Sequence, residues 1–195
     1  MAKKMRGSMF TGGAGGVHER QPEDFYATPS ETTKKLLDKL ELKGSILECA
    51  CGQGHISEVL KEYYPNSDIL STDIVDRGYA DEIKDFLTDD FERVDNVITN
   101  PPFKYCKQFV EKALEISNDK VIMLLKIQFL ESKSRKEFLE NSPLKYIYVF
   151  SERQNTMKNG DPINPLNGKP WSSTMLLAWF VWEKGYEGEP IVRWL

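Results

Sequence analysis

The sequence has few of the residues on which disulfide frameworks and metal sites depend. Its 195 residues include three cysteines and two histidines. So few cysteines, in an odd number, argue against a disulfide framework and favour a reducing, cytoplasmic compartment. The cysteines are Cys49, Cys51 and Cys106, and their spacing does not match a zinc site. With two histidines, a histidine-based metal site or catalytic triad has little support, so we expect no bound metal.

Long apolar runs and an excess of positive charge are also missing. The longest apolar runs, 121–125 and 175–182, are too short to span a bilayer, and the basic residues 1–4 lack the apolar stretch of a secretory signal. Lys and Arg total 26 against 30 Asp and Glu, a net charge of −4. This balance excludes a protein that holds nucleic acid by overall charge alone. Hydrophobic residues make up 40% of the chain, which suffices for a globular core.

The sequence divides into a glycine-rich N-terminal segment and one domain. Residues 1–22 contain the run TGGAGG at 11–16 and little apolar periodicity, which is typical of a flexible tail. Such glycines can also let a backbone approach phosphates, although no helix follows them. We interpret residues 23–195 as a single domain.

Short apolar segments alternate with helical patterns along this domain. Ser30 is expected to cap the first helix. Strand followed by helix is the pattern of a mostly parallel sheet with helices on both faces. Only the polar loop 152–173 separates the last two strands, so we expect them to form a terminal antiparallel pair in a seven-stranded sheet. The predicted strands are 45–50, 68–73, 83–87, 95–99, 120–127, 145–151 and 174–182, and the helices lie near 30–40, 56–63, 109–116 and 135–141.

A glycine turn follows the first predicted strand. Residues 48–54 read ECACGQG, so Gly52 and Gly54 stand where a strand ends and a helix begins. Glycines permit close backbone approach, and a helix N-terminus offers free N–H groups, which favours a nucleotide-binding turn over an ordinary one. The full dinucleotide fingerprint and the P-loop lysine are both absent. Glu48 is a candidate to interact with a cationic ligand.

Two acidic positions follow in register with the glycine turn. Asp73 comes about 20 residues after the glycines, where a carboxylate can accept from both hydroxyls of a ribose. Asp85 could accept from an adenine amino group while Phe86 packs on the ring. Because residues 81–95 carry seven acids, Asp85 could equally be an ordinary surface residue.

The most specific motif is Asn-Pro-Pro-Phe at residues 100–103, after the fourth predicted strand. Pro101 and Pro102 fix the backbone and remove two N–H donors. The Asn100 side-chain oxygen and the Pro101 carbonyl are two acceptors that can converge on one exocyclic NH₂ group, and Phe103 can stack on the attached ring. The alternative is a rigid loop around a buried phenylalanine.

Taken in this order, the motifs resemble those of the S-adenosylmethionine (SAM)-dependent amino-methyltransferases. Among these the chain most resembles the small phage-type N6-adenine DNA methyltransferases, with a further upstream motif at 24–29 (DFYATP) and a gamma-like motif order. The resemblance covers about residues 23–182. It implies a Rossmann-like class I methyltransferase fold and SAM as cofactor. Gln53 and Glu48 depart from the family pattern, and no large target-recognition domain is evident.

The resemblance also implies a role for each matching residue. Asn100, Pro101, Pro102 and Phe103 would be catalytic. Because a sulfonium methyl group is already activated, catalysis would consist of positioning and desolvation. In duplex DNA the target base would first be flipped out. The cofactor would be held by Tyr26, Thr28, Pro29, Glu48, Cys49, Gly52, Gly54, Asp73, Ile74, Asp85, Phe86 and Asn100.

Basic and aromatic residues near the expected site are candidates to bind nucleic acid. Segregated positive charge can bind phosphates despite a net charge of −4, although solvated lysines are the alternative. We interpret loop 152–173 as a minimal substrate loop. The candidates are Phe103, Lys126, Arg135, Arg153, Lys158, Lys169 and Trp171.

The expected activity is methylation of the N6 amine of adenine, with DNA favoured over RNA as partner. The alternatives are an RNA base, the amide of a protein glutamine, or a cofactor-binding subunit that depends on a protein partner for target recognition. Residues 1–22 are too few for the helical domain that glutamine methyltransferases usually carry. The intact motif at 100–103 argues against an inactive subunit. No membrane association is expected.

Overall fold

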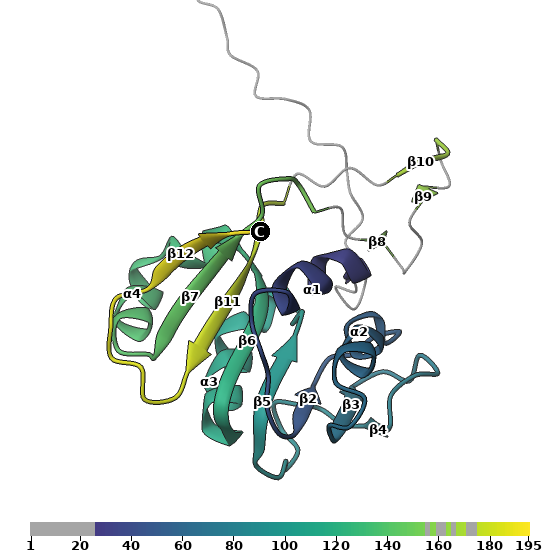
Figure 1. Cartoon of the computed structure of the whole chain (residues 1–195), viewed down its shortest axis with the longest axis horizontal. Helices are drawn as coiled ribbons and strands as arrows, with labels where there is room; N and C mark the ends of the chain where they lie inside the picture. The colour runs from purple at the N-terminus through teal and green to yellow at the C-terminus, as the bar shows by residue number, and fades with distance from the viewer. Residues whose placement is uncertain (1–25, 155–156, 159–162, 165–166, 171–174) are drawn as a thin grey trace, which may run out of the picture.

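The computed structural model describes residues 26–154, 157–158, 163–164, 167–170 and 175–195 (Figure 1). Within them one large sheet has the strand order β12-β7-β11-β6-β5-β2-β3-β4. Strand β11 is antiparallel to both of its neighbours, whereas the other pairings are parallel. The expected Rossmann-like α/β sheet with an antiparallel pair is confirmed. The strands are β2 (Ile46–Glu48), β3 (Ile69–Asp73), β4 (Glu82–Ile83), β5 (Val94–Thr99), β6 (Ser117–Lys126), β7 (Leu144–Val149), β11 (Leu177–Glu183) and β12 (Ile191–Trp194).

Helices cover both faces of the sheet. Strand β6 shows how, because successive side chains of a strand point to opposite faces. Ile122 and Leu124 pack with α1 (Ser30–Leu37) and α2 (His55–Tyr63). Val121 and Met123 pack on the other face with α3 (Cys106–Ile116). A fully apolar strand is therefore the sequence signature of a strand buried on both sides.

The antiparallel half of the sheet is held by large aromatic side chains. Trp179 and Trp182 of β11 are fully buried on opposite faces. The indole Nε1 of Trp179 donates to the Thr32 carbonyl at 3.0 Å, which ties this half of the sheet to α1. Trp179 was expected to pack in the sheet, and it does.

The strand boundaries correct the sequence prediction in two places. The sheet has an eighth strand, β12, whose four residues are all exposed, so it lacks the buried apolar pattern by which strands are recognised. The predicted third strand, 83–87, is reduced to β4. Its second half is a turn, because Asp85 Oδ1 accepts from Leu87 N at 2.9 Å and Asp85 N donates to an oxygen of Asp89 at 2.9 Å.

The first helix also begins differently than expected. Pro29 occupies the N-cap position, with an extended ψ of 139°, and Ser30 is the first helical residue. The Pro29 carbonyl accepts from Thr32 N at 2.9 Å. A serine therefore does not cap this helix, and the preceding Thr28-Pro29 sets its entry instead.

The segment after β7 returns to the carboxyl edge of the sheet, above the upper ends of the strands in Figure 1. Strand β8 (Met157–Lys158) pairs antiparallel with β1 (Tyr26–Ala27). Strands β9 (Ile163–Asn164) and β10 (Lys169–Pro170) form a second small pair. The described parts of loop 152–173 are thus partly extended, and β8 lies beside Tyr26–Ala27 of the N-terminal motif. Trp171 and residues 1–22 lie outside the described residues.

The connection from β6 to β7 passes through two short helices. These are the 3-10 helix η2 (Ile127–Leu130) and α4 (Lys133–Glu140), and the latter matches the predicted helix at 135–141. Among the described residues, no helix is long and apolar enough to cross a membrane.

Candidate functional site

A cavity of about 600 Å³ opens where β2, β3 and β5 end. Parallel strands present the loops at their carboxyl ends to one edge of the sheet, so the separate motifs meet there. The size suits a nucleoside-sized ligand. The predicted residues that line the cavity are Tyr26, Thr28, Glu48, Cys49, Asp73, Ile74, Asp85, Phe86, Asn100, Pro101, Pro102 and Phe103.

The glycine turn connects β2 to α2 beside this cavity. Gly54 has a φ of +83°, a conformation that favours glycine, and it precedes the first residue of α2. The ring of Tyr79 lies against it, so that a Cβ added at Gly54 would meet ring carbons at 2.4 Å. Tyr79 is itself held, since its hydroxyl contacts Glu58 at 2.5 Å and Lys61 at 3.0 Å.

Asp73 organises this turn from the end of β3. One carboxylate oxygen accepts from Gly52 N at 2.7 Å. The other accepts from Val75 N at 2.9 Å and from the guanidinium of Arg77 at 3.0 Å. Both charged side chains are largely buried, at 8% and 15% exposed. The residue expected to hold a ribose therefore already binds the chain's own donors, and Arg77, which sequence reasoning missed, also lines the cavity.

Glu48 is a buried acid in the cavity wall. It is 1% exposed, and Ser57 Oγ donates to one of its oxygens. Ser57 and Ser71 hydroxyls lie 2.7 Å apart. Burial raises the pKa of Glu48 to about 8, although the hydrogen bonds from Ser57 lower it. The carboxyl group is thus mostly neutral at neutral pH, and a cation placed near it would favour its ionised form.

Asp85 and Phe86, which follow β4, lie in different surroundings. Phe86 is 2% exposed and packs in the core, with its ring centroid 5.1 Å from that of Phe109 and 5.3 Å from that of Phe91. Asp85 stays half-buried and uses one oxygen for its turn with Leu87. On the facing loop, Ile74 is 62% exposed and offers an apolar surface.

The Asn100 amide is held in one orientation by the N-terminal segment. Its Nδ2 donates to the Tyr26 carbonyl at 3.0 Å and to Thr28 Oγ1 at 3.1 Å. Because a carbonyl can only accept, the nitrogen must face Tyr26, and the oxygen Oδ1 must face the other way. Among the described residues, no hydrogen-bond donor contacts Oδ1 or the Pro101 carbonyl.

Phe103 lies between an aromatic ring and a cation. Its centroid is 6.3 Å from that of Tyr26, with 28° between the planes. Lys126 Nζ lies 4.2 Å from the Phe103 ring centroid. The Pro102 carbonyl accepts from Tyr105 N at 2.9 Å, which starts the 3-10 helix η1 (Phe103–Tyr105).

The predicted nucleic-acid residues are less concentrated than the predicted cofactor residues. Lys126 reaches Phe103, but Arg135 is held elsewhere: its guanidinium donates to the carbonyls of Phe129, Gln128 and Glu131 and so fixes η2. Exposed Arg153 and Lys169 do not line the cavity, and Lys158 lies in β8.

Sequence reasoning missed two residues that follow the Asn-Pro-Pro-Phe motif directly. Lys104 and Tyr105 both line the cavity, and both are exposed. A basic residue next to an aromatic one was the available signal, but only the turn of η1 brings them to the cavity.

Comparison with known proteins relates the chain through its fold. No protein-family model matches it, and no curated protein matches its sequence. A solved protein of Lactococcus lactis, provisionally named a hemolysin, is 16% identical with a TM-score of 0.56, over 84% of this chain and 91% of the other. The magnesium protoporphyrin IX methyltransferase ChlM of Synechocystis PCC 6803, solved with bound SAM, is 11% identical with a TM-score of 0.53, over 80% and 79%.

A third similar structure contains DNA. It is the DrdV–DNA complex, 14% identical with a TM-score of 0.52, over 87% of this chain and 27% of that chain. The chain has the Rossmann-like methyltransferase fold. At these identities the likeness concerns the fold, and chemistry must be argued from the site itself.

Proposed function

We propose that this protein transfers a methyl group from SAM to the exocyclic N6 amine of adenine in DNA. One observation carries the proposal. The Asn100 amide donates to Tyr26 and Thr28, which presents its oxygen as an acceptor in the cavity wall that also contains Pro101. Two such acceptors match the two N–H groups of an aromatic amine.

Methylation of an aromatic amine requires that its nitrogen lone pair leave conjugation with the ring. Acceptors that hold both hydrogens favour a tetrahedral nitrogen, and Phe103 offers a ring face for the base. SAM supplies an activated methyl group, so the chain has to position the amine rather than attack with a side chain. As the N–C bond forms, the methyl–sulfur bond of SAM would break to leave S-adenosylhomocysteine, and the amine would lose one proton. Asn100 and Pro101 are neutral acceptors that do not keep it, so the proton passes to water.

The opposite wall fits the cofactor by the chemistry of its groups. Asp73 would accept from a ribose hydroxyl with the carboxylate oxygen that now has a single donor, Gly52 N. Exposed Ile74 offers an apolar face for the adenine ring. Asp85 has one oxygen outside its turn and would accept from the adenine amine. Glu48 would face the cationic part of the molecule, where its ionised form is favoured.

The fold comparisons support this assignment at the level of cofactor and polymer. ChlM was solved with bound SAM, and DrdV was solved with DNA. DNA specificity rests on the resemblance of the motif at 100–103 and its neighbours. The predicted roles of residues 152–173 and of a protein partner remain predictions.

The test is transfer of the labelled methyl group of SAM to duplex DNA, single-stranded DNA and RNA, with the product nucleosides identified. We expect N6-methyladenine in DNA. In Asn100→Ala the rate of methyl transfer should fall about 100- to 1000-fold, the usual effect of removing one preorganised polar contact to the reacting group. Binding of S-adenosylhomocysteine, measured by calorimetry, should persist.

A matched control is Asn141→Ala. Asn141 is exposed at the end of α4, and its Nδ2 donates to the Glu137 carbonyl, so this variant should methylate normally. Label on RNA or on a protein glutamine, with none on DNA, would reassign the substrate. Cofactor binding without label on any acceptor would contradict the proposal.

A further inference from the structure

Two aromatic rings at the cavity each have a lysine ammonium over them. Lys104 Nζ lies 4.9 Å from the centroid of the Tyr105 ring, and Lys126 Nζ lies 4.2 Å from that of Phe103. Tyr105 is 39% exposed, so part of this residue is accessible to a ligand. Lys126 comes from the end of β6, whereas Lys104 and Tyr105 belong to η1, so two separate elements supply the cluster.

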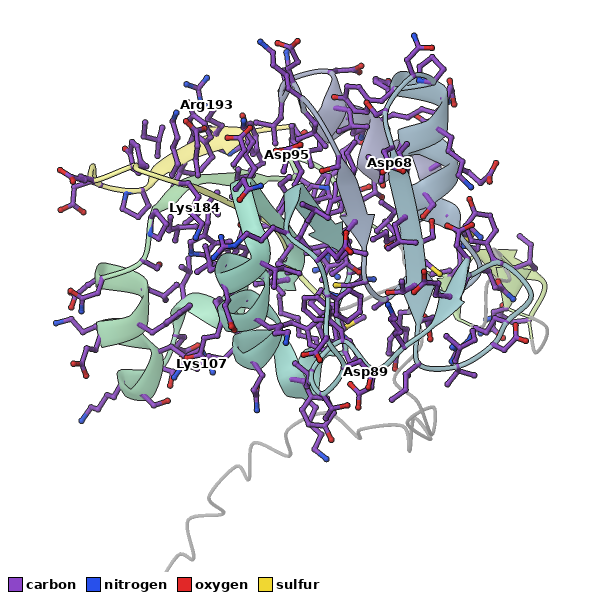
Figure 2. All side chains as sticks on the ribbon, turned by 90° about the horizontal axis from the view of Figure 1, so that it is seen from below. Asp68, Asp89, Asp95, Lys107, Lys184 and Arg193 are labelled. Atoms are coloured by element: carbon purple, nitrogen blue, oxygen red, sulfur yellow. The ribbon has the colours of Figure 1, made fainter. Side chains whose placement is uncertain are left out.

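Lys104 and Lys126 have no acidic partner among the described residues. Seven described lysines have one, including Lys84 with Glu82 at 2.6 Å and Lys107 with Glu111 at 3.3 Å. Figure 2 shows Lys107 on the face that α3 and α4 form, one helical turn beyond Lys104. In a chain with net charge −4, the charges of Lys104 and Lys126 are left available to an anionic ligand.

We propose that Lys104, Tyr105 and Lys126 form a strand-docking surface that receives the DNA strand on either side of the target base. Tyr105 stacks on a neighbouring base, and the two ammonium groups bind the flanking phosphates. This inference rests on the proposed function and names how the polymer, rather than the single base, is held. It makes the substrate a polynucleotide and not a free nucleoside or a glutamine side chain.

The present positions of the lysines fit such a role. An exposed ammonium over a ring face, such as that of Lys104, is held more weakly than a base stacked on an aromatic side chain. An arriving base therefore displaces the ammonium, which is then left within one side-chain length of the base's own phosphate. Alternating rings and anions are the chemistry of a nucleic-acid strand, and an acidic peptide offers only the anions.

The experiment measures binding of a fluorescent single-stranded DNA of about 12 nucleotides, within the usual site size of a strand-binding groove. The full chain is used with S-adenosylhomocysteine present, and the salt concentration is varied. Lys104→Ala and Lys126→Ala should each reduce the slope of log affinity against log salt by about 0.7. Tyr105→Leu should weaken binding about five- to hundredfold without changing that slope, and Tyr105→Phe should bind as the parent does.

Lys39→Ala is the matched control. Lys39 is exposed and has no ion pair with a described residue, but it lies after α1, on the path to the opposite edge of the sheet where β2 begins. Its salt slope should be unchanged. Equal binding of poly-glutamate, or parental slopes in both lysine variants, would overturn the inference, as would DNA binding that is unaffected in Tyr105→Leu.

The outcome also separates this inference from the proposed function. Tyr105- and lysine-dependent DNA binding without any methyl transfer would support the docking surface and contradict the activity. Methyl transfer to DNA with an unchanged KM in Lys104→Ala, Lys126→Ala and Tyr105→Leu would support the activity and contradict the docking surface. Thermal unfolding checks that each exposed substitution leaves the fold intact.

Discussion

The two walls of the cavity satisfy their polar groups in opposite ways. In the wall built from β2 and β3, Glu48 and Asp73 accept hydrogen bonds from the chain itself, from Ser57, Gly52, Val75 and Arg77. In the wall built from β5 and β1, the chain holds the donating side of Asn100 and leaves its oxygen and the Pro101 carbonyl without a donor among the described residues. The first wall is internally closed, and the second is open toward a ligand.

We therefore expect the two walls to contribute differently to stability and to methyl transfer. Internally satisfied acids give the glycine turn a fixed shape, so changes there should affect stability and cofactor binding together. Open acceptors contribute little to the fold, so changes there should affect methyl transfer alone. Variants at Gly54, Glu48 and Thr28 test that separation.

The largest effect on the closed wall is expected from Gly54→Ala. The φ of +83° is costly for alanine, and the added Cβ would push Tyr79 away from Glu58 and Lys61. We expect the free energy of unfolding to fall by about 2–3 kcal/mol, with loss of cofactor binding. Urea unfolding and calorimetry measure the two effects.

Gly78→Ala isolates the steric part of this effect. Gly78 has a similar φ of +79°, but a Cβ there would meet nothing within 4 Å. Gly78→Ala should lower the free energy of unfolding by about 1 kcal/mol, which is the backbone contribution alone. Equal losses in the two variants would mean that Tyr79 does not support the turn.

A second effect on the closed wall depends on pH. The folded-state pKa of Glu48, about 8, lies above the ordinary glutamate pKa of 4.5, so the folded state binds more protons than the unfolded state between these values. The contribution of Glu48 to stability is therefore fully present below about pH 4.5. It is lost as the pH rises toward 8, by at most about 1.4 kcal/mol per pH unit. Glu48→Gln should remove this slope in urea unfolding measured across that range.

The same variant tests the link to a cationic cofactor. Asp73 and Lys61 are the charged groups that act on Glu48, the former raising and the latter lowering its pKa. If SAM places a cation nearby, binding should release a proton from Glu48 at neutral pH and tighten as the pH rises. Glu48→Gln should bind without that proton release, as calorimetry in two buffers of different ionisation enthalpy would detect. An identical proton release in both proteins would disprove the link.

The smallest effect belongs to the open wall. Thr28→Val removes one of the two acceptors of the Asn100 amide and leaves the Tyr26 carbonyl alone to hold it. We therefore expect kcat to fall about tenfold, equal to roughly 1.4 kcal/mol, with KM and unfolding nearly unchanged. Thr28→Ser keeps the oxygen and should restore kcat. Thr33→Val is a suitable control, because Thr33 Oγ1 is buried without a hydrogen-bond partner among the described residues. A similar loss of kcat in Thr33→Val would show that the effect of Thr28→Val does not come from its hydrogen bond to Asn100.

Most of the fold was predictable, and the exceptions have physical causes. Segments such as 121–125 and 177–182 are continuously apolar, because both faces of their strands are covered by helices or by the neighbouring core. Strand β12 was missed because it lies at the sheet edge with all residues exposed. The strand predicted at 83–87 was too long because Asp85 forms a turn, and local side-chain hydrogen bonds of that kind compete with strand pairing.

The sequence predicted that the motif residues converge at one edge of the sheet. It did not predict the contacts of individual side chains. Twelve predicted residues line one cavity, because parallel strands bring their carboxyl ends together. Arg135 was predicted as a phosphate ligand, yet its guanidinium binds the carbonyls of η2. A sequence reveals that an arginine is present, but whether nearby carbonyls already bind it depends on packing.

Local sequence patterns were enough to predict the alternation of strands and helices, the order of the motifs and the presence of two acceptors at Asn100 and Pro101. These follow from periodicity and residue chemistry, which are local. Which oxygen of the site is open depends on tertiary packing, because the acceptor that orients the Asn100 amide is the carbonyl of Tyr26, 74 residues earlier. The raised pKa of Glu48 depends on packing too, since desolvation arises from everything packed around a group and from no single neighbour in sequence.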